Sequence, residues 1–298
     1  MPREHYMVFS AIASILAPVF ICVFIGFCWA RKGQSYDTEL ITSLVTYFGT
    51  PCLVFYSLSS VQLLPNTLLS MGLAAIFANV AFIIIGGLVL AIFRLPQRTY
   101  LQTLSFPNVG TVGLPLCYLA FGDEGLALGV TFFSVYVVFQ MTVGVAFVSG
   151  TFSANSLFKM PIIPATILAA FFLFTGTQVP EPIYNTTKLI GDLTIPLMLI
   201  TLGVSLSRLK VRRLKISFLL SALRLSMGLG VGVILVFLMH LSEPASGVVI
   251  LQCSMPSAVF CYLFAQIYDQ RPEEIAGIVI VSTILGFSFL PVLLWYVL

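Results

Sequence analysis

The chain has 298 residues, of which 59% are hydrophobic and 8% are charged, and its formal net charge is +3. This composition excludes an ordinary soluble domain, in which about a quarter of the residues are charged. The small positive charge does not indicate a nucleic-acid partner, because the basic residues lie in short segments between apolar stretches. The sequence therefore predicts an all-α membrane protein that crosses the lipid bilayer several times.

Apolar stretches of about twenty residues recur along the chain, and a helix of that length crosses about 30 Å of hydrocarbon. We predict ten such spans and no separate soluble domain. The first span is not a cleavable signal peptide, because it is too long and its basic pair, Arg31 and Lys32, follows it. The ten spans are predicted at residues 7–30, 39–60, 68–93, 98–121, 125–148, 159–178, 184–206, 215–239, 245–267 and 274–297.

The positions of Lys and Arg predict the orientation of the spans. Only Arg3 and Lys188 fall on the side that carries both termini, so we expect the termini on the non-cytoplasmic side. For the basic Arg208–Lys215 segment we favour a topology anchor over binding of anionic lipid. Eleven of the fourteen basic residues follow odd-numbered spans, namely Arg31, Lys32, Arg94, Arg98, Lys159, Arg208, Lys210, Arg212, Arg213, Lys215 and Arg271.

The two halves of the chain, residues 1–149 and 150–298, carry similar features. Each half holds five predicted spans, so a repeat must insert in opposite orientations. Pro107 in the fourth span and Pro256 in the ninth are separated by 149 positions. We therefore predict two inverted five-helix repeats. The same offset relates Glu124 to Glu273 and Ser134 to Thr283, and further breaks are expected at Pro51 in the second span and Pro196 in the seventh.

The fourth span contains the stretch Ser105–Pro115, with two prolines and two glycines at its centre. Proline lacks an N–H donor and crowds the preceding turn, and glycine adds backbone freedom, so we expect a broken helix. A second break is expected around Pro256 in the ninth span. In lipid, the freed backbone groups must find partners in protein or in a water-filled cavity. A proline that only kinks a packed helix is the alternative at either position.

Two broken helices that face one cavity would form an anion site. Each second half-helix would begin at mid-depth with free N–H groups and the positive end of its dipole. Such ends favour an anion without placing a full positive charge in lipid. The candidate binding residues are Pro107, Asn108, Gly110, Thr111, Ser254, Pro256 and Ser257.

Two charged residues lie inside predicted spans, where charge is costly and often functional. Asp192 precedes Pro196 by about one turn, and it is our candidate proton acceptor or cation ligand for coupling. Arg224 lies roughly ten residues into the eighth span, and its residue type alone assigns it no role. The alternative for both residues is structural: a mutual ion pair, or a side chain that extends to the membrane interface.

The sequence carries no signature of an enzyme or of an ATP-driven pump. It lacks a phosphate-binding glycine loop, an H-E-x-x-H zinc motif and a nucleophile elbow. The six cysteines fall inside apolar spans without metal or disulfide spacing, so we predict no metal site and no cofactor. Transport would then depend on a gradient of substrate or coupling ion. An intramembrane enzyme is the least favoured interpretation.

Four segments resemble motifs of the auxin efflux carrier family, which is related to the bile acid, arsenite and riboflavin transporter superfamily. This family contains bacterial malate and malonate carriers and plant auxin exporters. The resemblance covers nearly the whole chain, and Ser282-Thr283 follows the fourth segment as a serine-threonine pair often does in the tenth span. The segments are Thr46–Ser60, Asn108–Leu116, Ile190–Leu206 and Met255–Tyr268.

The resemblance implies ten helices in two inverted repeats, with spans 4 and 9 crossing at prolines as in NhaA and the bile-acid symporters. It also implies a scaffold domain of spans 1, 2, 6 and 7 and a transport domain of spans 3–5 and 8–10 that moves like an elevator. Substrate would bind beside the crossing, at Pro107, Asn108, Gly110, Pro256 and Ser257. Members are often homodimers. The long loop of many plant members is absent here, so the shorter bacterial type is the closer match.

The sequence therefore predicts a secondary active transporter of small organic anions in a bacterial plasma (inner) membrane. The expected substrates are mono- or dicarboxylates such as malate or malonate, or auxin-like acids, with a proton or sodium as the coupling ion. One alternative is a sodium-coupled symporter of the bile-acid type, which a sodium dependence would favour. The other alternative is a membrane sensor that binds an anion without transporting it.

Overall fold

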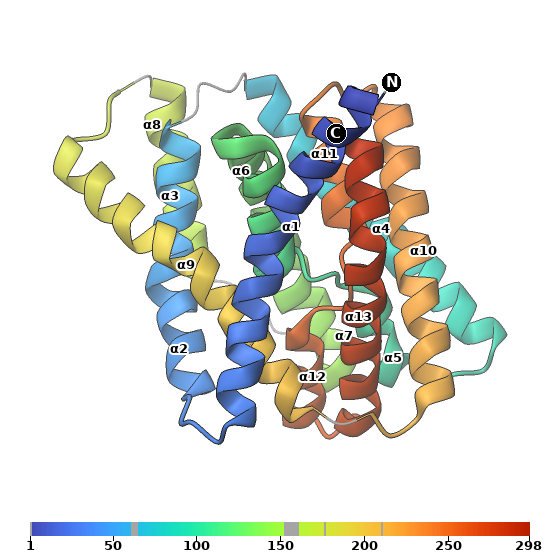
Figure 1. Cartoon of the computed structure of the whole chain (residues 1–298). Coiled ribbons are helices and arrows are strands. Elements are labelled where there is room, and N and C mark those ends of the chain that lie inside the picture. Colours follow the sequence, from blue (N-terminus) through green and yellow to red (C-terminus); the bar gives the residue numbers. More distant parts are fainter. Residues whose placement is uncertain (1, 61–64, 152–160, 176, 210) are drawn as a thin grey trace.

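The computed structural model describes residues 2–60, 65–151, 161–175, 177–209 and 211–298 (Figure 1). These residues form helices and no strand, so the predicted all-α fold is confirmed. Lys159 and Lys210, which contribute to the predicted orientation, lie outside the described residues. Figure 1 shows the helices arranged as a bundle in which α1, α10 and α13 stand roughly upright and α9 runs obliquely.

Seven helical segments in the described ranges are long and apolar enough to cross a membrane. Each of the ten predicted spans contains helix, but α5, α8, α11 and α12 are too short for that criterion, so ten crossings stay a prediction. The helices are α1 (Pro2–Arg31), α2 (Thr38–Leu44), η1 (Val45–Gly49), α3 (Thr50–Ser60), α4 (Pro65–Ile92), α5 (Gln97–Ser105), η2 (Val109–Gly113), α6 (Leu114–Phe139), η3 (Gln140–Gly144), α7 (Val145–Ser149), α8 (Ile162–Thr175), α9 (Glu181–Arg208), α10 (Leu214–Met239), α11 (Ala245–Cys253), α12 (Val259–Ile267) and α13 (Pro272–Val297).

Helix α6 changes direction at Gly122, where φ is 64° and ψ is −152°. Glycine adopts this backbone conformation readily, because it has no Cβ atom to clash with the chain. The change lies in residues 122–124, between the predicted fourth and fifth spans. The segment Val109–Ser149 is otherwise helical throughout, through the π-helical turns η2 and η3.

The breaks expected at Pro51 and Pro196 are absent, and this prediction was wrong. Pro51 is the second residue of α3, directly after the π-helical turn η1, whose wider spacing leaves room for the proline ring. Pro196 lies inside α9, which continues without interruption from Glu181 to Arg208. Helices of membrane proteins tolerate such prolines where neighbouring groups take over the freed backbone groups. Proline alone therefore does not identify a break in this chain.

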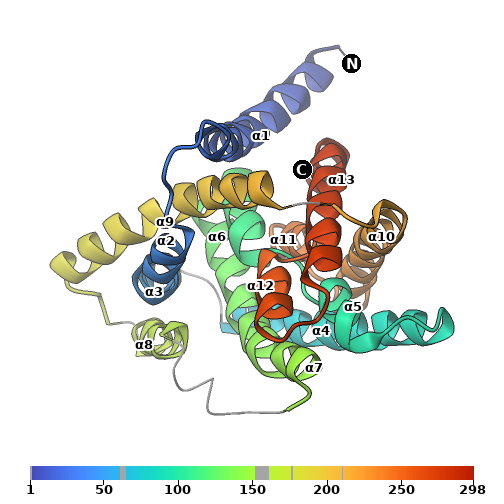
Figure 2. The same cartoon turned by 90° about the horizontal axis from the view of Figure 1, so that it is seen from below.

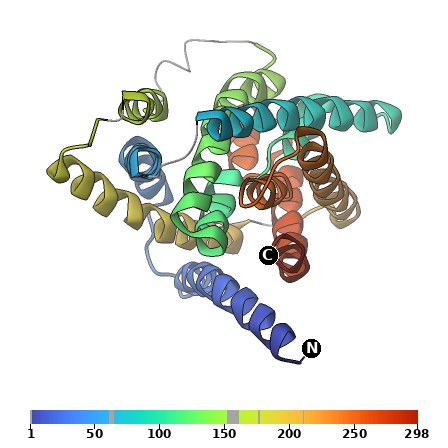
Figure 3. The same ribbon diagram turned by 90° about the horizontal axis from the view of Figure 1, so that it is seen from above.

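Seen along the bundle, α1, α2, α3, α8 and α9 lie to one side, and α4, α5 and α10 to α13 lie to the other (Figures 2 and 3). Helices α1 and α9 approach closely because glycines face the partner backbone. A Cβ atom on Gly26 would come within 2.0 Å of the Ile200 carbonyl oxygen, and one on Gly203 within 1.9 Å of the Val23 oxygen. Small residues allow such contact between helices in membranes. The assignment of these groups to scaffold and transport domains stays a prediction.

Candidate functional site

The two helix breaks predicted at Pro107 and Pro256 are present, and they lie against each other. Helix α5 ends at Ser105 and helical structure resumes at η2; α11 ends at Cys253 and α12 begins at Val259. Pro107 and Ser257 form an isolated antiparallel bridge. The N–H of Asn108 donates to the Pro256 carbonyl oxygen over 2.7 Å. The N–H of Ala258 donates to the Phe106 carbonyl oxygen over 3.0 Å. We call this pair of extended segments, residues 106–108 and 254–258, the crossing.

The carbonyl groups at the end of α5 are paired within the protein. The Gln102 oxygen accepts from the N–H of Phe106 over 3.0 Å. The Thr103 oxygen accepts from the hydroxyl of Ser257 over 2.8 Å, so this side chain from the opposite segment completes the helix end. The Leu104 oxygen accepts from Arg224 Nη1 over 2.7 Å. An unpaired carbonyl away from water would be costly, so these bonds stabilise the broken helix.

Arg224 on α10 closes the ends of both first half-helices. Besides the Leu104 oxygen, its guanidinium donates to the carbonyl oxygen of Cys253, and Nε donates to that of Met255 over 3.4 Å. The residue is 0% exposed, and its Cζ atom lies 4.2 Å from the centre of the Phe82 ring on α4. The structural alternative predicted that Arg224 pairs with Asp192 or extends to the membrane interface. Arg224 does neither.

The start of each second half-helix has a different character from these closed ends. The Asn108 carbonyl accepts from the N–H groups of Val112 and Gly113, whereas no backbone acceptor for Gly110 or Thr111 is found in the described ranges. Gly110 and Thr111 are partly exposed, as is Val259 at the start of α12. N–H groups at a helix start that lack a backbone acceptor favour an anion.

Asn108 is the predicted site residue with the clearest unused capacity. It is 4% exposed, and its Nδ2 atom has no hydrogen-bond partner among the described residues. Ser254 is equally buried, and its hydroxyl also lacks a partner there. Buried polar groups are normally paired, so such groups indicate a ligand or water. Ser257, in contrast, uses its hydroxyl to hold the crossing together.

The structure adds residues that sequence reasoning missed. The Tyr136 hydroxyl, from α6, donates to the Pro107 carbonyl, and the Ser282 hydroxyl, from α13, accepts from the N–H of Ser257 over 3.1 Å. Gln252 packs where a Cβ atom on Gly113 would lie 2.1 Å from its Oε1 atom. Tyr136 offers no signal in the sequence, because tyrosines are common in such helices. The pair Ser282-Thr283 offers one as part of the family resemblance.

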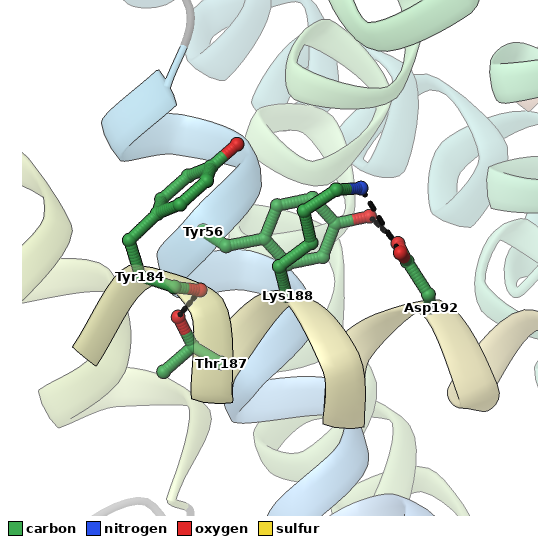
Figure 4. A network of polar contacts seen from close by, with 5 residues as sticks. All are labelled: Tyr56, Tyr184, Thr187, Lys188 and Asp192. Carbon is green, nitrogen blue, oxygen red and sulfur yellow. Dashed lines mark hydrogen bonds and ion pairs between the residues drawn. The ribbon is translucent and has the colours of Figure 1, made fainter. Parts of the chain in front are cut away.

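Asp192, the predicted coupling residue, lies in a separate network that joins α9 to α3 (Figure 4). Its carboxylate accepts from Lys188 Nζ over 2.9 Å and from the Tyr56 hydroxyl over 2.8 Å. The Lys188 ammonium also lies 5.1 Å from the centre of the Tyr56 ring. The Asp192 and Lys188 side chains are 51% and 42% exposed, so the pair lies on the surface of the helix bundle. In the same view, the hydroxyl of Thr187 donates to the Tyr184 carbonyl over 3.0 Å.

Comparison with known proteins covers almost the whole chain. A family described as membrane transport protein matches residues 11–151 and 147–296, which include both segments of the crossing. An uncharacterized transporter, MJ1031 of Methanocaldococcus jannaschii, is 24% identical over 302 aligned residues. That alignment covers 93% of this chain and 95% of the relative.

Proposed function

Because this chain belongs to the membrane transport protein family, the auxin efflux carrier family whose motifs it resembles, we propose that it is a secondary active transporter of small organic anions. Family membership identifies a transporter rather than an enzyme. The substrates we propose are mono- or dicarboxylates, such as malate or malonate, or auxin-like acids.

The observation that carries this proposal is the contrast between the two kinds of helix end at the crossing. The carbonyl ends of α5 and α11 are buried and receive donors, including Arg224. At the start of η2, the N–H groups of Gly110 and Thr111 have no backbone acceptor in the described ranges, and they lie beside the unpaired amide of Asn108. A carboxylate that lies against this start would accept from backbone N–H groups and from Asn108 Nδ2, as charge-assisted hydrogen bonds.

Transport would follow by movement of one group of helices against the other. Helices α4 to α7 and α10 to α13 would form the transport domain and carry the crossing. Helices α1, α2, α3, α8 and α9 would form the scaffold and the contact between two copies in a homodimer. Both termini would lie on the non-cytoplasmic side of the plasma membrane. In this mechanism the substrate moves with its site across the bilayer, and the backbone bonds of the crossing stay intact.

Asp192 remains our candidate for proton coupling. Its carboxylate faces Lys188 and Tyr56, on α9 and α3 of the proposed scaffold. Its side chain is half-exposed on the helix bundle, so the carboxylate is not enclosed by the protein core.

Uptake of labelled malate and of a labelled monocarboxylate into proteoliposomes tests this proposal. The gradients are a pH gradient, a sodium gradient, or neither, with empty liposomes as the control. Uptake that a pH gradient accelerates would support the proton-linked carrier, and acceleration by sodium alone would instead favour the symporter of the bile-acid type. Binding of these acids without uptake would identify a sensor and would contradict the proposal.

A further inference from the structure

We infer that Arg224 fixes the charge of the bound substrate, so that the site accepts an anion with a single negative charge and rejects a dianion. This inference rests on the proposed function and names the substrate class more narrowly. The charges and the helix ends that meet at the crossing support this inference.

The C-terminal ends of α5 and α11 are the negative helix ends at the crossing. A helix C-terminus carries the equivalent of about half a negative charge, so α5 and α11 together contribute about one negative charge. Arg224 donates to the Leu104 carbonyl in the last turn of α5 and to the Cys253 carbonyl at the last residue of α11. Its single positive charge therefore offsets both ends, and a guanidinium remains charged at neutral pH.

The N-terminal ends of η2 and α12 are the positive helix ends at the crossing. The starts of η2 and α12 contribute together the equivalent of about one positive charge, and no charged side chain is bonded to either. The side chains that hydrogen-bond at the crossing besides Arg224 are neutral: those of Tyr136, Ser257, Cys261 and Ser282. None of the ion pairs in the described ranges involves Arg224. The crossing therefore keeps about one uncompensated positive charge, located where the N–H groups of Gly110 and Thr111 have no backbone acceptor in the described ranges.

One carboxylate balances this charge, and a second carboxylate of the same ligand would find no counter-charge. An uncompensated charge away from water is costly. The site should thus take a monocarboxylate, or a dicarboxylate that carries one proton. The geometry also prevents Arg224 from serving a second charge, because three carbonyl oxygens and the Phe82 ring already surround it.

The packing of α10 against α11 keeps Arg224 in this position. Gly228 follows Arg224 by one turn, and a Cβ atom there would lie 2.2 Å from the Cys253 oxygen and 3.1 Å from Arg224 Nη2. The absence of a side chain at Gly228 lets α10 approach the end of α11 closely enough for the guanidinium to reach both helices. Arg224 is accordingly a positioning residue, which acts on the substrate through the field of the helix ends.

The wild-type protein provides the first test, with malonate and its monomethyl ester as competitors of transport in proteoliposomes. The monoester has one negative charge at every pH above its only ionisation. We expect its inhibition constant to stay the same on both sides of the second ionisation of malonate. The inhibition constant of malonate should rise about tenfold for each pH unit above that ionisation, as the monoanion disappears.

Equal inhibition by malonate above and below its second ionisation would overturn this inference and leave anion transport standing. If neither compound inhibits and no organic acid is transported, the proposed function itself fails. The two failures are therefore distinguishable. Because the test uses the wild-type protein, it does not depend on whether a variant folds.

Arg224→Gln and Arg224→Lys provide the second test, with Ser226→Ala on the exposed side of α10 as the control. The measured quantity is the affinity for monomethyl malonate divided by that for the neutral dimethyl ester. We expect this ratio to fall at least about tenfold in Arg224→Gln and to return partly in Arg224→Lys, which restores the charge but not the three bonds. A merely structural role would weaken both ligands alike and leave the ratio unchanged, which would refute the inference.

Discussion

Replacement of Asn108 by alanine separates substrate binding from stability of the crossing. Nδ2 of Asn108 is buried and has no partner among the described residues, so truncation of the side chain breaks no bond of that atom within the protein. The backbone hydrogen bonds of Asn108 remain. Its N–H donates to the Pro256 oxygen, and its carbonyl accepts from the N–H groups of Val112 and Gly113. We therefore expect Asn108→Ala to fold with nearly unchanged stability.

The expected loss lies in the affinity for the anion. A hydrogen bond to a charged group contributes about 1.5–3 kcal/mol. That range corresponds to a rise of roughly 10- to 150-fold in the dissociation constant of the substrate. The free energy of unfolding should change less than it does on loss of a buried hydrogen bond within the protein, because the Asn108 amide donates to no group there.

Ser257→Ala is the matched control, because it removes a buried hydroxyl from the same crossing. That hydroxyl donates to the Thr103 oxygen over 2.8 Å, and its loss leaves a buried carbonyl without its donor. We expect a loss of about 1–3 kcal/mol in the free energy of unfolding. The assays are unfolding in increasing dodecyl sulfate and the KM of uptake into proteoliposomes.

The reasoning is refuted if Asn108→Ala loses as much stability as Ser257→Ala while the KM of transport stays the same. That result would mean that the Asn108 amide supports the fold and does not contact the substrate.

Two further substitutions test other parts of the structure. Asp192→Asn should abolish the acceleration of uptake by a pH gradient. Lys188→Gln breaks the same ion pair and should retain this acceleration. Acceleration that persists in Asp192→Asn would show that Asp192 has no coupling role. Gly228→Ala places a Cβ atom 2.2 Å from the Cys253 oxygen and should cost about 1–3 kcal/mol or more in the same unfolding assay. Gly230→Ala, which has no atom within 4 Å, should not destabilise α10, and equal effects of the two substitutions would contradict the packing of α10 on α11.

The crossing shows what a local sequence signal can establish. Pro107 and Pro256 interrupt helices, and next to Pro107 the residues Asn108 and Gly110 mark where the chain becomes helical again. Pro51 and Pro196 carry the same local signal and do not interrupt a helix. The difference depends on which groups surround each proline, and those groups come from other helices. Hydropathy likewise predicts apolar helices, because it measures a property of each segment alone.

Arg224 and Asp192 show what the sequence leaves open. Both are charged residues inside apolar stretches, and residue type alone left open a mutual pair for them. In the structure, Arg224 bonds to Leu104, which is 120 positions away, and Asp192 bonds to Tyr56, which is 136 positions away.

The sequence by itself determined a helical membrane protein of a transporter family and four candidate helix breaks, of which those at Pro107 and Pro256 are present, because hydropathy, proline and the family motifs are properties of short segments. The tertiary structure decided that the two interruptions meet, that Arg224 closes their carbonyl ends and that the amide of Asn108 stays unpaired. These features depend on helices brought together across more than a hundred positions of chain. Such contacts follow from packing, whose outcome no local pattern specifies.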